Sequence, residues 1–579
     1  MLDSDKLLIT CFYCIFFHGI FLVLQRRQLQ NLEIYMLKNY GRRDRLALLV
    51  GAVTLSVMLI LAPQTNKAQA QGTLKVGMTL ADIPVSFGQP DQGFEGFRFM
   101  GLMLYDALIN WDMSQGDKPS GLIPGLAESW SVDPSDKTKW TFKLRKNVKF
   151  HDGSACNADA VIFNFDKLLD KNSPQFSARQ GSLVNFRIPS IKSYKKVDEY
   201  TVEFITHKPD SFVPYQLCYI LIASPTQWEK TGKDWNTFAK TPSGTGPWKL
   251  ETLVPREKAE FIPFKGHWDT NRVPKLDKVI TIPIPDPNAR TAALLSGQVD
   301  WIEAPAPDAI PRIKSKGFEV VANAYPHVWS WHLSRVEGSP WNDIRVRKAA
   351  NLAVDREGIK ALLGGYAVPA SGHVTPADPW YGSPSFKIKY DPDAAKSLLK
   401  EAGFSKDNPV KIKAMISASG SGQMLPLPMN EYIQQNLADV GIKVDFEVTE
   451  WNALIDLWRG GAKSPQAKGA HVINVSYTTQ DPYSSFTRFL RSDLHAPKGV
   501  NWGFYNDPKM DELLYAASAA FDPKERNAVL AKVHAREVDD AAFLWVVHDV
   551  APRAMAKKVQ GYVQAKNWFQ SLTSAYIKK

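Results

Sequence analysis

The side chains that could perform chemistry are scattered along this 579-residue chain. No GxSxG elbow, HExxH motif or Walker phosphate loop is present, and no CxxC pair follows residue 71. Of the 11 histidines, His151 lies in a loop sequence and His332 in an apolar run, where a structural role is more common than metal ligation. Asp539 and Asp540 are adjacent on an expected helix, so their carboxylates diverge. The sequence therefore predicts neither an enzyme nor a metal site, and a hydrolase is kept as the alternative of another class.

Binding is better supported by the aromatic side chains. The chain has 17 Trp, 19 Tyr and 29 Phe. Aromatic residues bury a large area with few rotatable bonds, which suits a pocket that must close around a solute. A micromolar ligand needs about 8 kcal/mol of binding free energy, which burial and a few charged hydrogen bonds can supply without a cofactor.

Composition indicates a large globular protein rather than a nucleic-acid binder. Hydrophobic residues make up 44% of the chain and charged residues 22%, and the formal net charge is +11. The basic residues are spread out and form no cluster with interleaved aromatic residues, so we expect a solvated surface. Cys156 and Cys218 could form a disulfide or remain two buried thiols, and sequence separation does not decide between them.

The amino end has the layout of a secretory signal peptide. Arg42, Arg43 and Arg45 precede an apolar run over residues 46–62, and a small-residue cleavage site ends at Ala70. A second apolar run, residues 7–24, is long enough to be a membrane-helix candidate. We interpret residues 1–35 as a mis-assigned upstream segment, residues 36–70 as the signal peptide, and the mature protein as periplasmic. A membrane-tethered form is the alternative.

Strands and helices must position any site. Trp130, a turn through residues 133–136, and the alternation of Trp140, Phe142 and Leu144 predict a hairpin with one buried face. Asn157 and Asp159 are expected helix caps for the amphipathic run that follows. The apolar runs 328–333 and 543–550 are typical of buried strands.

Seven segments, taken in order, resemble one family. They are residues 121–166, 245–250, 287–301, 343–366, 431–451, 481–490 and 501–514. Together they are similar to the peptide/nickel class, family 5, of the bacterial extracellular solute-binding proteins, which serve ABC importers. The resemblance implies an α/β fold of two lobes with a hinge and an additional α/β domain on lobe one. It divides the chain into lobe one (71–115, 244–329 and 549–579), the additional domain (116–243) and lobe two (330–548).

The resemblance also implies partners and a set of ligand-binding residues. The partners are a small solute or peptide and the membrane permease, with no nucleic acid, and the protein is expected to be a monomer. The candidate ligand-binding residues are Phe94, Glu95, Trp451, Thr478, Asp481, Asn501 and Trp502. For Trp451 and Trp502 a place in the core is the alternative, and for Asp481 a helix cap beside Pro482.

Thr478 is the most informative departure from the family. Peptide-binding relatives carry a carboxylate three residues before the Asp-Pro pair, where it holds the α-ammonium of the peptide, and this chain has Thr478 there. A neutral hydroxyl cannot balance a buried ammonium group. We therefore expect a peptide-like or other small polar solute rather than an ordinary free-amine peptide. A nickel-chelate or haem receptor of the same family is the alternative.

Overall fold

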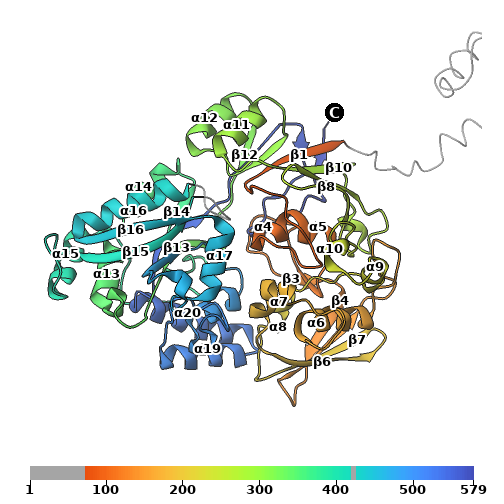
Figure 1. Cartoon of the computed structure of the whole chain (residues 1–579), viewed down its shortest axis with the longest axis horizontal. Coiled ribbons are helices and arrows are strands. Elements are labelled where there is room, and N and C mark those ends of the chain that lie inside the picture. The colour runs from red at the N-terminus through yellow and green to blue at the C-terminus, as the bar shows by residue number, and fades with distance from the viewer. Residues whose placement is uncertain (1–71, 419–424, 579) are drawn as a thin grey trace, which may run out of the picture. The chain divides into compact units, whose positions relative to one another are not determined.

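The computed structural model describes residues 72–418 and 425–578, so the predicted leader lies outside the described residues. These residues form two lobes, each built around a mixed β-sheet with helices packed on it (Figure 1). The expected two-lobe α/β fold is confirmed. Among the described residues no helix combines the length and the apolar character that a membrane span requires.

Lobe one is organised by a sheet that has seven strands within the described residues, in the order β12-β20-β11-β1-β10-β9-β8. Its strands are β1 (Thr73–Met78), β8 (Trp248–Val254), β9 (Lys258–Pro263), β10 (Lys278–Pro283), β11 (Trp301–Glu303), β12 (Glu319–Val321) and β20 (Arg553–Met555). The central strand β1 runs parallel to both β10 and β11, and the remaining pairs are antiparallel. Strand β20 lies between β12 and β11, so a segment near the carboxyl end of the chain is part of this sheet.

A smaller antiparallel sheet, ordered β4-β5-β7-β6, belongs to the additional domain. Its strands are β4 (Ala127–Val132), β5 (Lys139–Leu144), β6 (Ile191–Asp198) and β7 (Thr201–Thr206). The predicted hairpin is β4 and β5, with Trp140, Phe142 and Leu144 buried on one face. Helix α6 (Ala158–Leu169) begins after Asn157, whose side chain accepts a hydrogen bond from the Ala160 amide as predicted. Asp159 is not the cap, because it lies inside the first turn and pairs with Lys196 (2.8 Å).

The sheet of lobe two also has seven strands within the described range. Its strands are β13 (His327–Leu333), β14 (Ala367–Pro369), β15 (Val410–Ser417), β16 (Ile442–Thr449), β17 (Val472–Asn474), β18 (Tyr477–Thr478) and β19 (Phe543–Asp549). Apolar clusters cover both of its faces, since Val328 packs on one side and Trp329 on the other. A strand buried on both faces has no polar side to show, which explains the continuous apolar runs in the sequence.

The remaining elements are short strand pairs and helices. The pairs are β2 (Ile109–Trp111) with β3 (Leu122–Pro124), and β21 (Val559–Gln560) with β22 (Tyr576–Ile577). The other helices of lobe one and its additional domain are α4 (Gly93–Gly96), α5 (Leu102–Leu104), α7 (Ala178–Val184), α8 (Val213–Leu217), α9 (Pro225–Lys230), α10 (Trp235–Phe238), α11 (Pro287–Leu295) and α12 (Ile310–Ser315). Those of lobe two are α13 (Ile344–Ala353), α14 (Arg356–Leu362), α15 (Pro392–Glu401), α16 (Pro426–Val440), α17 (Trp451–Gly460), α18 (Arg488–Leu490), α19 (Pro508–Ala519) and α20 (Pro523–Asp539).

Two chain crossings join the sheets of the lobes. The first follows β12 and enters β13, and the second leaves β19 and enters β20. The crossings lie side by side, because the Asn323 amide donates to the Val550 carbonyl (3.0 Å). The two apolar runs predicted as hinge strands are β13 and β19, which pair antiparallel. A pair of adjacent crossings is the arrangement that a hinge between lobes requires.

Cys156 and Cys218 are both free and buried. Burial raises the pKa of each thiol. The structure therefore agrees with two buried thiols rather than a disulfide.

Candidate functional site

The segment of lobe two that meets lobe one runs from β18 through a π-helical turn, η7 (Tyr483–Thr487), into α18. Thr478 ends β18, which pairs with β13. Its Oγ1 donates to the Pro326 carbonyl (3.1 Å) and accepts from the Gln480 amide (3.3 Å). The fully buried Thr478 hydroxyl is thus used by the backbone at the start of the hinge strand.

Asp481 links this segment to lobe one. Its Oδ1 accepts a hydrogen bond from the Ser484 amide (2.7 Å), which confirms the predicted capping role. Its Oδ2 accepts from the Tyr219 hydroxyl of lobe one (3.1 Å), and that hydroxyl also accepts from Gln480 Nε2 (3.1 Å). Both oxygens of the carboxylate therefore have protein partners.

Two further contacts hold the lobes together near this point. The Tyr483 hydroxyl of lobe two donates to the carbonyl of Phe186, which lies in the short 3-10 turn η2 (Asn185–Arg187). The Ser211 amide donates to the Ser518 carbonyl of α19 (2.7 Å), and Figure 1 shows α7 and α8 on the side of α19. The two lobes consequently meet along η2 and α8 on one side and along η7 and α19 on the other.

Phe94 and Glu95 lie on the short helix α4 but have different surroundings. Phe94 packs in an aromatic cluster, with ring centroids 5.9 Å from Tyr219 and 5.4 Å from Phe569. Glu95 is fully buried, accepts from the Thr79 hydroxyl (3.4 Å) and lies 3.5 Å from Arg98. Burial raises the pKa of Glu95 even though the positive charge of Arg98 lowers it, and the negative charge of Glu303 adds to the increase. Phe94 thus faces the contact between the lobes, while Glu95 belongs to the ionic network behind it.

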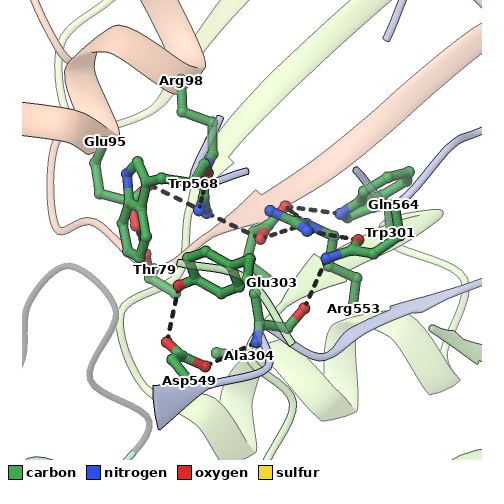
Figure 2. Close-up of polar contacts among 12 residues, drawn as sticks. Thr79, Glu95, Arg98, Trp301, Glu303, Ala304, Asp549, Arg553, Gln564 and Trp568 are labelled. Carbon is green, nitrogen blue, oxygen red and sulfur yellow. Dashed lines mark hydrogen bonds and ion pairs between the residues drawn. The ribbon is translucent and has the colours of Figure 1, made fainter. Parts of the chain in front are cut away.

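Figure 2 shows that network, with Glu303 between the guanidinium groups of Arg98 and Arg553. Arg98 Nη1 donates to Glu303 Oε2 (3.0 Å), and Arg553 Nε donates to both Glu303 oxygens (3.0 and 2.9 Å). Trp301 Nε1 also donates to Glu303 Oε1 (3.0 Å). The two arginines hold the pKa of Glu303 below its ordinary value, although burial alone would raise it. Glu303 is therefore the ionised centre of the network.

The network lies next to the second chain crossing. Arg553 begins β20, directly after that crossing, and Asp549 ends β19, directly before it. Asp549 accepts from the Ala551 amide (2.7 Å) and from the Tyr325 hydroxyl (3.1 Å) of the first crossing. Polar contacts thus extend from helix α4 to both crossings of the hinge (Figure 2).

The other three predicted residues lie in lobe two. Trp451 begins α17 and is buried in the same apolar cluster as Trp502. Asn501 shapes its own loop, because its side chain donates to the carbonyls of Arg491 and Tyr505 and accepts from the Tyr505 amide. Their contact with a ligand stays a prediction.

Four residues at the contact between the lobes were missed by sequence reasoning: Arg187, Tyr219, Tyr483 and Arg488. Arg187 lies over the ring of Tyr219, 4.1 Å from its centroid. Tyr483 and Arg488 fall inside segment 481–490, which the sequence had singled out, so their position in the chain was a usable signal. Arg187 and Tyr219 carried no such signal.

The two histidines considered in the sequence, His151 and His332, lie in structural surroundings. His151 Nε2 lies 2.9 Å from the Gly246 carbonyl oxygen. His332 is buried among the rings of Tyr477, Phe489 and Phe543, and burial lowers its pKa to about 3. Over residues 72–418 and 425–578 no group of three or more His, Cys, Asp or Glu side chains could hold a metal ion.

The amino-acid sequence matches a known family over most of its length. Residues 121–497 match the profile of the bacterial extracellular solute-binding proteins, family 5. The dipeptide-binding protein of Escherichia coli strain K12 is 29% identical over 528 residues, which cover 85% of this chain and 96% of that protein. The glutathione-binding protein GsiB of the same strain is 30% identical over 418 residues, covering 71% of this chain and 77% of that protein.

Solved structures agree with the fold. The DppA periplasmic binding protein of Helicobacter pylori, in complex with the peptide STSA, has a TM-score of 0.76 at 24% identity. The alignment covers 88% of this chain and 99% of that chain. HbpA2 of Haemophilus parasuis has a TM-score of 0.70 at 23% identity and covers 88% of this chain. At these identities the likeness shows the shared fold.

Proposed function

The chain belongs to family 5 of the bacterial extracellular solute-binding proteins. From this premise we propose that a peptide-like or other small polar solute binds between its two lobes. The site lies where Phe94 and Tyr219 face the 478–488 segment of lobe two. The protein is a substrate-binding component of an ABC importer. We propose further that the signal peptide is removed near Ala70, that the mature monomer works in the periplasm, and that it delivers the solute to a membrane permease.

One observation carries this proposal: among the buried polar groups of the described residues that have no hydrogen-bond partner, several lie where the lobes meet. They include Gln480 Oε1, Thr487 Oγ1 and Arg488 Nη2 in lobe two and two nitrogens of Arg187 in lobe one. Buried polar groups are nearly always hydrogen-bonded, because leaving one unpaired costs about 1–3 kcal/mol. A polar solute between the lobes would supply these partners, and the adjacent crossings 322–326 and 550–552 would allow the lobes to separate and admit it.

The test is to identify the solute that co-purifies with protein recovered from the periplasm, and then to titrate it back onto protein freed of it by unfolding and refolding. At one hundred times its dissociation constant the solute should stabilise the protein by about 2.7 kcal/mol. It should also reduce the radius of gyration in small-angle scattering, because the lobes close on it. An unchanged radius together with an unchanged melting temperature would argue against a closing receptor, and bound nickel or haem would favour the alternative named above.

A second expectation concerns free-amine peptides. The Thr478 hydroxyl is neutral and is used by Pro326 and Gln480, and both oxygens of Asp481 have protein partners. We therefore expect the protein to favour a tripeptide over its amino-acetylated form by less than tenfold, which corresponds to about 1.4 kcal/mol. Calorimetry with one matched pair decides it. A Thr478→Asp variant should shift the preference toward the free amine. A preference of tenfold or more in the unmodified protein would mean that an acidic residue such as Asp481 anchors the amine.

A further inference from the structure

Arg187 is a buried cation that forms no ion pair among the described residues. It ends the turn η2 of the additional domain on lobe one, and the residue is about 5% exposed. The guanidinium group lies over three rings, 4.6 Å from the centroid of Phe94, 4.8 Å from Phe186 and 4.1 Å from Tyr219. Its Nε and Nη1 are buried and have no hydrogen-bond partner. Stacking on aromatic faces stabilises a cation only in part, so two donors remain to be satisfied.

Arg488 is the corresponding residue of lobe two. It begins α18 directly after the turn η7 and is about 2% exposed. Its Nε donates to the Ser484 carbonyl (3.0 Å), and its guanidinium lies 4.4 Å from the ring centroid of Phe489. Its Nη2 is buried and has no hydrogen-bond partner. Among the ion pairs of the described residues, none includes Arg187 or Arg488.

The two arginines border the same contact between the lobes. Arg187 stacks on Tyr219, the Tyr219 hydroxyl donates to Asp481, and Asp481 caps the turn from which Arg488 emerges. Burial lowers the pKa of Arg187 to about 10, and the positive charge of Arg488 adds to the lowering, whereas Tyr219 and Asp481 oppose it. The two cations therefore lie within each other's electrostatic field.

The nearby carboxylates do not balance these charges. Both oxygens of Asp481 already accept hydrogen bonds, from Ser484 and Tyr219. Asp210 contributes to the charge around Tyr483, but it accepts from the Phe212 amide (2.9 Å) and from Gln216 Nε2 (3.0 Å). Two buried arginines thus share one adjacent carboxylate, and an unpaired buried cation is expensive.

We infer that the ligand carries an anionic group, a carboxylate or a phosphate, which Arg187 and Arg488 bind from opposite lobes. This inference rests on the proposed function and adds the chemical class of the ligand to it. The planar guanidinium fork suits both anions, and charge-assisted hydrogen bonds of this kind are about twice as strong as neutral ones. Because one arginine comes from each lobe, the anion would also draw the lobes together.

The experiment compares variants in protein expressed at full length and recovered from the periplasm. Arg187→Gln and Arg488→Gln remove one charge each, and Arg187→Lys and Arg488→Lys keep the charge without the fork. The control is Arg179→Gln on the neighbouring helix α7, because Arg179 is 57% exposed and lies 3.7 Å from Asp91. Melting temperatures without solute establish that each variant is folded. Where a glutamine variant is not folded, the corresponding lysine variant replaces it in the comparison.

The co-purifying solute should contain a carboxylate or a phosphate, and mass spectrometry distinguishes the two. Each glutamine variant should bind it at least tenfold more weakly in calorimetry, each lysine variant should lie in between, and the control should stay within twofold. Masking the anion of the solute, by methyl esterification or by removal of the phosphate, should weaken binding to the unmodified protein. The same masking should change binding to the Arg187→Gln/Arg488→Gln double variant very little.

Different results would overturn different statements. A neutral or cationic solute, or glutamine variants that bind within twofold of the unmodified protein, would overturn the anion inference and leave the receptor function in place. If no solute co-purifies, and neither glutathione nor inorganic phosphate raises the melting temperature, both the inference and the proposed function fail.

Discussion

Replacing Glu303 with glutamine is expected to lower the free energy of unfolding by about 3–5 kcal/mol, the range for removing one partner of a buried ion pair. Glu303 accepts hydrogen bonds from Arg98, Arg553 and Trp301, and all of these side chains are nearly inaccessible to water. Glutamine keeps the shape but leaves both arginines without their main counter-charge. Urea unfolding followed by tryptophan fluorescence measures the loss.

The matched control is Glu260→Gln. Glu260 also lies between two cations, Lys258 and Lys278, each 2.7 Å away, but both lysines are partly exposed. Exposed pairs contribute little because water and salt screen them, so this variant should change stability far less than Glu303→Gln. Equal losses in the two variants would show that burial does not set the strength of the Glu303 network.

The same substitution has a defined pH dependence. The folded-state pKa of Glu303 lies below its ordinary value of 4.5. A carboxyl group with a depressed folded pKa contributes stability that is fully present above the unfolded pKa and is lost as the pH falls through the folded pKa. The stability difference between the unmodified protein and Glu303→Gln should therefore be constant from pH 7 to about pH 5 and shrink at lower pH. A difference that grew on acidification would contradict the assignment of Glu303 as the ionised centre.

Replacing Gly246 with alanine is expected to lower the free energy of unfolding by about 3 kcal/mol, the upper part of the range for overpacking. A Cβ at this position would lie 2.5 Å from the Leu104 carbonyl carbon and from the Tyr105 amide nitrogen. These are backbone atoms, so no side-chain rotation relieves the clash. The Gly246 amide also donates to the Leu104 carbonyl (3.0 Å), which fixes the close approach.

Gly121→Ala is the control for this variant. A Cβ on Gly121 would meet nothing within 4 Å, and its φ lies outside the left-handed region. Its unfolding free energy should stay close to that of the unmodified protein, because a glycine-to-alanine change without a clash mainly reduces the freedom of the unfolded chain. If Gly246→Ala were as well tolerated as Gly121→Ala, the close contact with residues 104 and 105 would not be rigid.

Several local features were predictable because they depend on neighbouring residues. The hairpin over residues 127–144 followed from an alternating apolar pattern and a turn, and the start of α6 from the capping oxygen of Asn157. The hinge strands β13 and β19 were recognisable because strands buried on both faces are mostly apolar along their length. The capping role of Asp481 was likewise readable from the proline that follows it.

The sequence by itself determined these elements and the series of family segments. The series of segments in turn indicated the two-lobe fold and the receptor role. Only the tertiary structure decided which charged residues meet. Arg98, Glu303 and Arg553 are widely separated in the chain and come together because β11 pairs with β20 and the guanidinium group of Arg98 reaches Glu303. Arg187 and Arg488 border one contact because the lobes meet there. Local propensity and periodicity report interactions within a few residues, whereas the pairing of buried charges depends on how distant segments fold together.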